Sequence, residues 1–278
     1  MRGLPGPVAQ VVARAAANIY APLAGERRRQ VERNLRRVHG PDFGGFALRR
    51  AVAGTFESYD RYWADSFRLP GTSPAAIAAG IEVDGWGRIL EAREGDKGVI
   101  LAMPHLGGWE WAGFWATTCE HIPVTVVVEP VEPPDLYEWF VALREDLGMH
   151  VVPLGPSVAT SVLGALRDNH LVVLLCDRDL TGDGVEVEFF GETTTLPGGP
   201  ATLALRTGAP LFPGAVYFEG SGHRGVVRPA LDTARQGRLR ADVQRVTQDL
   251  AGELEWLIRQ APTQWHLLQP NWPSDRMN

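Results

Sequence analysis

From residue 81 onward, short apolar runs alternate along the chain with segments of helical periodicity. Strands bury apolar side chains in short runs, whereas amphipathic helices repeat them every three or four positions. The strand pattern occurs at 98–103, 123–128, 149–153, 170–176, 185–190, 210–218 and 223–228. The helix pattern occurs at 85–94, 107–119, 133–147, 157–168, 199–207 and 238–260. This alternation predicts an α/β fold with a central, mainly parallel or mixed β-sheet flanked by helices.

The first 80 residues differ from the rest because they have amphipathic helices in place of strands. Residues 8–21 gather apolar side chains on one helical face, and residues 45–67 do so with aromatic side chains as well. No internal repeat or low-complexity linker divides the chain. We therefore expect a single domain over 1–278, made of an N-terminal helical part (1–80) and an α/β core (81–278).

Residues 25–40 are the most basic segment of a chain whose formal net charge is −6. The net negative charge argues against non-specific nucleic-acid binding. The basic segment suits either a solvated helix face or a surface that lies on anionic lipid. Its arginines are Arg27, Arg28, Arg29, Arg33, Arg36 and Arg37.

Neither a membrane span nor a disulfide framework is expected. The longest uncharged stretch, 147–166, is interrupted by glycine and proline, and the N-terminus lacks the apolar core of a signal peptide. Cys119 and Cys176 are too few for a disulfide scaffold or a four-cysteine zinc site. Cys176 ends an apolar run and is expected to be a buried small side chain, so a reducing compartment fits.

The strongest local signal is LAMPHLGGWEWAG at 101–113. It places His105 between an expected strand and an expected helix, where α/β proteins carry reactive groups. If the helix begins at Gly107 and Gly108, Glu110 can turn back toward the imidazole. A carboxylate on one ring nitrogen fixes the tautomer and leaves the other nitrogen as a base. The glycines allow a tight turn and the close approach of a substrate to backbone N–H groups. The alternative is a partly buried histidine that caps a helix.

PHLGGWEWAG resembles the His-x4-Glu/Asp block of the lysophospholipid acyltransferase superfamily. The better match within it is the branch that contains the lipid A late acyltransferases and the actinobacterial phosphatidylinositol mannoside acyltransferases. The resemblance runs over roughly residues 25–273, and the ordered set of motifs makes it specific. The other matching motifs are VERNLRRVHG, FESYDRYWADSFRLP, VDGWGRILEAREGDKGVI, LREDLGMHVVPLG, LLCDRDLTGDGVEVEFFGETTTLPGGPATLALRTGAPLFP and APTQWHLLQPNW.

The resemblance implies a glycerolipid-acyltransferase-like fold and a set of site residues. His105 would be the general base that takes a proton from an acceptor hydroxyl, and Glu110 would orient it. Glu110 stands where many members of the mannoside branch have Asp. Arg144 matches the family's arginine and would bind phosphate or steady a thioester oxygen. The other substrate-binding positions that the resemblance implies are Glu129, Asp177, Arg178, Asp179 and His266.

Four of these residues also have a plainer interpretation. Arg144 could pair with a neighbouring acid on a solvated helix, Glu129 could be an inert loop residue, and Asp177 and Asp179 could be turn residues that cap backbone groups. Trp265 and Trp272 are expected to be packing residues.

No metal site is expected. His105 and Glu110 lack a second clustered histidine for zinc. Residues 177–188 approach a calcium-loop pattern, which would make the chain a calcium-regulated module. However, Thr181 replaces the usual acid or amide, and strand patterns lie on both sides of the loop.

The function that the resemblance implies is transfer of a long-chain acyl group, such as palmitoyl, from acyl-CoA to a mannose hydroxyl of a phosphatidylinositol mannoside. The acyl group would pass directly, without an acyl-enzyme and without a cofactor, and acyl-carrier protein is an alternative donor. The implied partners are acyl-CoA, the glycolipid acceptor and an anionic membrane, with the protein peripheral on the cytoplasmic face of the plasma membrane. The alternatives are another glycolipid of the lipid A type or a lysophospholipid as acceptor, and a non-catalytic lipid-binding protein on the same fold.

Overall fold

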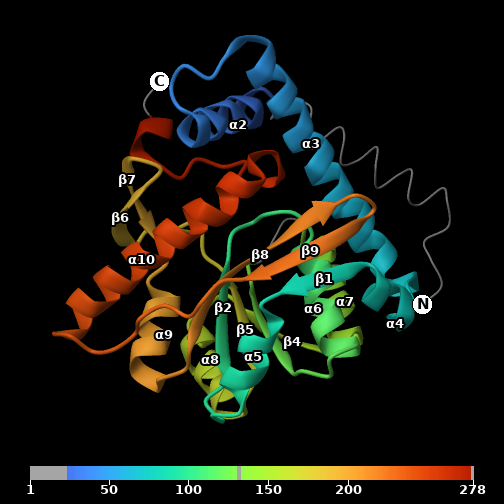
Figure 1. Cartoon of the computed structure of the whole chain (residues 1–278), viewed down its shortest axis with the longest axis vertical. Coiled ribbons are helices and arrows are strands. Elements are labelled where there is room, and N and C mark those ends of the chain that lie inside the picture. The colour runs from blue at the N-terminus through green and yellow to red at the C-terminus, as the bar shows by residue number, and fades with distance from the viewer. Residues whose placement is uncertain (1–23, 130–132, 277–278) are drawn as a thin grey trace.

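The centre of the molecule is a seven-stranded sheet in the order β1-β9-β8-β2-β5-β3-β4 (Figure 1). The computed structural model describes residues 24–129 and 133–276. Neighbouring strands are parallel except β8 and β9, which are antiparallel. The α/β fold with a mainly parallel sheet is thereby confirmed. The strands are β1 (Ile81–Asp84), β2 (Val99–Met103), β3 (Val124–Val128), β4 (Met149–Pro153), β5 (Leu171–Leu175), β8 (Leu211–Glu219) and β9 (Gly222–Val227).

Helices cover both faces of this sheet, which explains why its strands are nearly continuous apolar runs. All five residues of the central strand β2 are buried. One face packs against α5 (Trp86–Arg93), α6 (Trp109–Thr118) and α7 (Pro134–Asp146) through a core that contains Ile89, Phe114 and Phe140. The other face packs against α8 (Val158–Arg167), α9 (Gly199–Thr207) and α10 (Leu239–Gln260) through Val162, Ala201 and Leu254.

Three short elements are present that the sequence patterns did not predict: α4 (Pro74–Ala79), β1 and β7 (Glu192–Leu196). β1 has four residues and β7 reads ETTTL, so neither shows a clear apolar run. β7 pairs with β6 (Val185–Phe189) in a separate two-stranded hairpin. The hairpin turn is formed by Phe190 and Gly191, which both have positive φ, as a tight turn between twisted strands requires.

The N-terminal helices α2 (Ala24–His39) and α3 (Gly45–Arg68) form a third apolar core with the chain's C-terminal residues. Val31 and Leu35 of α2 meet Leu48 and Val52 of α3, and Leu268 joins them. The helix expected at 8–21 lies outside the described residues. Within the described part of the chain, no helix has the length and apolarity that a bilayer crossing needs.

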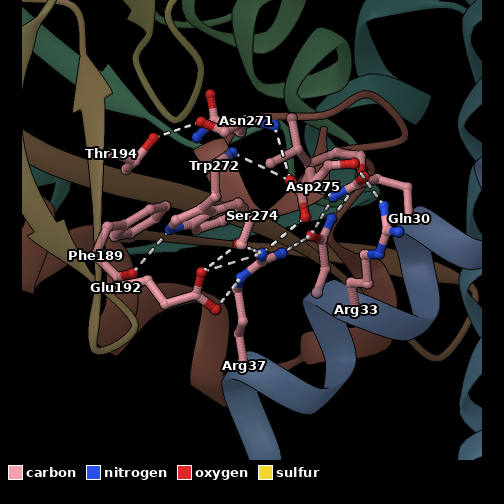
Figure 2. Close-up of polar contacts among 12 residues, drawn as sticks. Gln30, Arg33, Arg37, Phe189, Glu192, Thr194, Asn271, Trp272, Ser274 and Asp275 are labelled. Carbon is pink, nitrogen blue, oxygen red and sulfur yellow. Dashed lines mark hydrogen bonds and ion pairs between the residues drawn. The ribbon is translucent and has the colours of Figure 1, made fainter. Parts of the chain in front are cut away.

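Residues 262–276, here called the C-terminal segment, are bound to α2 through a buried carboxylate (Figure 2). Asp275 accepts hydrogen bonds from Gln30 at 2.8 Å, from Arg37 at 2.7 Å and from the backbone of Asn271 and Trp272. Arg37 also pairs with Glu192 of the hairpin at 2.9 Å. Arg33 donates a hydrogen bond to the Asp275 carbonyl. Arg33 and Arg37 therefore make contacts within the protein, whereas the sequence suggested that they lie on a solvated or lipid-facing surface.

Candidate active site

His105 lies just beyond the carboxyl end of β2, near the middle of the sheet. β2 pairs in parallel with β5, and Met103 is opposite Leu175. The next backbone bond, from the Cys176 N–H to the Met103 carbonyl at 2.8 Å, continues this register past the strand ends. His105 and Asp177 each follow their strand end by two residues, so the register brings them together.

The side chains of these residues form a hydrogen-bonded pair. His105 Nδ1 lies 2.6 Å from Asp177 Oδ1, and the His105 backbone N–H donates to Asp177 Oδ2 at 3.1 Å. Burial alone would raise the pKa of Asp177, but His105 and the hydrogen bonds to the carboxylate hold that pKa below its ordinary value. The ionised carboxylate therefore accepts the Nδ1 proton, and Nε2 is left as the basic nitrogen.

The loop after His105 is a tight turn, as the two glycines predicted. Gly107 has a φ of 61°, and a Cβ atom there would lie 2.0 Å from the Val216 carbonyl oxygen. Only glycine fits this close approach to β8. However, the Gly107 N–H donates to the Gln264 carbonyl and the Gly108 N–H to the Val216 carbonyl. These groups are thus bound within the protein, contrary to the expectation that they face a substrate.

Glu110 does not contact His105 as the sequence spacing suggested. Its carboxylate is buried on the first turn of α6 and accepts hydrogen bonds from Arg144 on α7 and from the Tyr62 hydroxyl on α3, the latter at 3.2 Å. Helix α6 begins at Trp109, so Glu110 projects sideways between two helices while His105 turns toward β5. The carboxylate that orients His105 in the structure is Asp177.

In the Glu110–Arg144–Tyr62 cluster, named for its three members, the charge of Glu110 keeps the two neighbouring side chains protonated. Burial would lower the pKa of Arg144, but the charge of Glu110 raises it above its ordinary value. Burial raises the pKa of Tyr62 and the charge of Glu110 raises it further, so the phenol remains a donor. Arg144 Nη1 is buried and has no hydrogen-bond partner among the described residues. Arg144 is therefore paired through two of its nitrogens and has a third donor to offer.

His266 of the C-terminal segment lies beside the His105–Asp177 pair. Its backbone N–H donates to the His105 carbonyl at 2.7 Å, and its Nε2 is 2.9 Å from the Ser58 hydroxyl. Burial, and then the charge of His105, lower the pKa of His266 to about 3. His266 is therefore neutral at physiological pH, and its Nδ1 has no partner in the described part of the chain.

The remaining predicted residues separate into two groups. Arg178 pairs with Glu129 at 2.7 Å, and both line the same cavity as His105. Asp179 instead accepts the backbone N–H groups of Thr181, Gly182 and Gly184, as a turn residue does. It is not among the residues that line the cavity.

A cavity of about 880 Å³ opens beside His105. Its polar wall contains Glu110, Arg144, Arg178, Glu129 and His266. The rest is mainly apolar and follows α6 and the strands β2, β3 and β5 down from their carboxyl ends. The apolar lining on that side includes Leu101, Met103, Trp109, Ala112, Gly113, Ala116, Val124, Val126, Phe140, Leu171 and Val173. A pocket with a basic nitrogen at its polar end and a long apolar wall can hold a molecule with a reactive head and an apolar chain.

Two comparisons relate this chain to known proteins. Residues 1–274 match the family model described as bacterial lipid A biosynthesis acyltransferase. A protein of Mycolicibacterium smegmatis named phosphatidylinositol mannoside acyltransferase is 40% identical over 281 residues, which cover 99% of this chain and 88% of that protein. A protein of Mycobacterium tuberculosis with the same name is 40% identical over 257 residues, covering 88% of this chain and 77% of that protein. The resemblance found in the motifs is thereby confirmed, and the chain belongs to the bacterial lipid A biosynthesis acyltransferase family.

Proposed function

We propose that this protein transfers a long-chain acyl group from acyl-CoA to a mannose hydroxyl of a phosphatidylinositol mannoside. The observation that carries the proposal is the His105–Asp177 pair at the polar end of a largely apolar cavity. The names of the relatives support the mannoside acceptor. The volume of the cavity, about 880 Å³, and its mainly apolar lining support a long-chain donor.

The proposed reaction is a direct transfer. Nε2 of His105 accepts the proton of the acceptor hydroxyl while that oxygen attacks the thioester carbonyl, and the new C–O bond forms. The tetrahedral intermediate then collapses and its C–S bond breaks. The imidazolium returns its proton to the departing thiolate, which leaves as CoA-SH. Asp177 stabilises the imidazolium between these two proton transfers.

We assign substrate binding to the polar wall. Arg144 is fixed by Glu110 and lines the cavity, and its buried Nη1 has no partner among the described residues, so we assign its guanidinium to a phosphate of the donor or to the developing oxyanion. His266 is neutral and lines the cavity, and its Nδ1, which has no partner among the described residues, is assigned to an acceptor hydroxyl. The Glu129–Arg178 pair supplies both a hydrogen-bond acceptor and a positive charge on the same wall.

The apolar wall is proposed to hold the acyl chain, and Ala112 on α6 tests this. Ala112→Phe fills part of the cavity, so palmitoyl-CoA should lose more kcat/KM than octanoyl-CoA. Burial of one methylene contributes about 0.8 kcal/mol, so two excluded methylenes correspond to a change in preference of roughly tenfold. The control is Ala142→Phe, which changes an exposed position of α7. An equal loss of kcat/KM for both donors would mean that the acyl chain does not bind along this part of the cavity.

Membrane attachment is proposed for the exposed arginines near the start of α2. Arg28 and Arg29 are exposed, and the contact of Arg28 is the neighbouring Glu32. Replacing both arginines by Glu should weaken binding to anionic vesicles by about 1 kcal/mol or more per residue, and most strongly at low salt. The matched control reverses Arg238 and Arg240 at the start of α10, which are also exposed. Unchanged vesicle binding in the α2 variant would refute this attachment.

The deciding experiment measures release of CoA from palmitoyl-CoA by the purified protein, with and without a mannosylated phosphatidylinositol. Acceptor-dependent release, together with mass-spectrometric detection of the acylated mannoside, is expected. Acceptor-independent release would indicate thioester hydrolysis and contradict the proposed acceptor. Binding of acyl-CoA without any release, also in the presence of lipid A precursors or lysophospholipids, would favour a lipid-binding protein.

A further inference from the structure

The Asp177 carboxylate receives hydrogen bonds from three donors. Its Oδ1 accepts from His105 Nδ1 at 2.6 Å, and its Oδ2 accepts from the His105 backbone N–H at 3.1 Å. The third donor is the indole Nε1 of Trp265, which lies 2.8 Å from Oδ2. Trp265 is thus the one donor to this carboxylate, within the described residues, that does not belong to His105.

We propose that Trp265 is a positioning residue, whose indole N–H fixes the Asp177 carboxylate so that Oδ1 faces the imidazole of His105. The proposal rests on the proposed function, because it assigns Trp265 a part in the same proton transfers. Trp265 does not line the cavity, and its effect on the reaction passes entirely through Asp177.

The C-terminal segment holds both members of the pair at once. The backbone of Trp265 forms an antiparallel bridge with Leu106, and the next residue, His266, donates to the His105 carbonyl. The same stretch therefore contacts the His105 loop through its backbone and Asp177 through a side chain. Asn271 adds a bond from its Nδ2 to the Asp177 carbonyl at 3.2 Å.

The indole itself is fixed by packing. Trp265 is buried, and its ring contacts Phe190, Phe189 and Trp272 at centroid distances of 5.5, 6.2 and 6.3 Å. A buried, packed side chain offers its donor in one orientation and loses little entropy on making the bond. The geometry is that of a support for a catalytic carboxylate rather than of a substrate contact.

The hydrogen bond also affects the charge that His105 experiences. A donor on Oδ2 withdraws part of the carboxylate's negative charge from Oδ1. Without the indole, more of that charge faces the imidazole, and the imidazolium is favoured up to higher pH. The other titratable or charged groups around the pair are His266, the Glu110–Arg144–Tyr62 cluster, the Glu129–Arg178 pair, Arg27 and the thiol of Cys176. Replacing Trp265 alone leaves every one of these groups in the protein.

The test compares two aromatic substitutions in the same cluster, Trp265→Phe and Trp272→Phe. Both indoles are buried, and both donate one hydrogen bond, Trp272 to the Phe189 carbonyl at 3.1 Å. The two variants should therefore lose similar stability, but only Trp265→Phe removes the bond to Asp177.

We expect kcat/KM of Trp265→Phe to fall about tenfold, the change that corresponds to one hydrogen bond to a charged group. The KM for palmitoyl-CoA should not change, and the acid limb of the pH profile should move to higher pH. Trp272→Phe should keep the wild-type acid limb.

The proposal is overturned if the pH profiles of the two variants coincide after correction for the folded fraction.

If wild type shows no acceptor-dependent transfer, the proposed function fails, and the positioning role is then tested by a measurement that does not depend on activity. NMR titration of ring-labelled histidine, with the His105 signal identified by its absence in His105→Ala, should show His105 titrating at higher pH in Trp265→Phe than in wild type or Trp272→Phe. Equal titrations in all three proteins would overturn the proposal.

A second measurement applies if Trp265→Phe does not fold. In protein labelled with 15N-tryptophan, the indole N–H signal of Trp265 should follow the titration of His105 and should shift in Asp177→Asn. The ring of Trp109 contacts His105, so its indole signal can respond to the same titration, and Trp109→Phe removes that signal from the spectrum. The absence of any remaining indole signal that responds to both changes would refute the bond between Trp265 and Asp177.

Discussion

Replacing Asp177 by Asn is expected to lower kcat for acyl transfer by about a thousandfold or more, the range known for an amide in place of the carboxylate of a catalytic triad. The amide group of Asn can donate a hydrogen bond to Nδ1 of His105, but it lacks the negative charge that keeps the imidazole proton on Nδ1. The imidazole then carries its proton on Nε2, which cannot act as a base. Acceptor-dependent CoA release measures kcat, and the KM for palmitoyl-CoA should stay close to the wild-type value because Asp177 does not line the cavity.

The control for this variant is Asp179→Asn. Asp179 is two residues away and caps backbone N–H groups, which the oxygen of an amide can still accept. It should retain most of its activity. If Asp177→Asn and Asp179→Asn lose activity equally, the loss reflects the loop and not the carboxylate that contacts His105.

His105→Ala is expected to lower acyl transfer at least about a hundredfold, because it removes the proposed general base. The side chain is partly exposed to the cavity, so the folded structure should tolerate the change. The acid limb of the pH profile should also disappear, since no group remains that must lose a proton before the acceptor is attacked. His150→Ala is the matched control, because His150 is exposed on β4 and distant in the sheet order from β2. Activity of His105→Ala near that of the control would exclude His105 as the base.

Most of the fold could be predicted because buried parallel strands have continuous apolar sequences. β2, β3 and β5 are such runs, and each was expected within one or two residues of its place. β1 and β7 could not be predicted, because a short strand in a small hairpin or at a sheet edge carries too few apolar side chains to be distinguished from a loop.

The partner of His105 could not be predicted from local spacing. Glu110 is five residues away and was expected to orient the imidazole, whereas Asp177 is 72 residues away and does so in the structure. The choice depends on β5 lying next to β2, which is a property of the sheet order. The sequence did show that Asp177 follows an apolar strand, and this is the signal that brings it to the same sheet edge as His105.

The contacts of the basic segment, which forms helix α2, could not be predicted from local sequence either. Six arginines suggested a solvated helix face or a surface that lies on anionic lipid, but Arg33 and Arg37 lie on the helix face that also carries Gln30 and Asn34. That face meets the C-terminal segment, which is more than 230 residues further along the chain. Helical periodicity identifies such a face but cannot tell which distant segment covers it.

The position of the C-terminal segment also determines when the contacts around His105 can be completed during synthesis. A nascent chain that has emerged as far as α10 contains every strand of the sheet and both His105 and Asp177. It still lacks the indole of Trp265, the backbone bond to His105 and the carboxylate of Asp275 that joins α2. Since α2 precedes every strand of the sheet in the chain and the C-terminal segment follows them all, the contacts between α2 and this segment form only after the strands have been synthesised. A chain whose synthesis stops after α10 therefore carries His105 and Asp177 but lacks the indole bond to the Asp177 carboxylate.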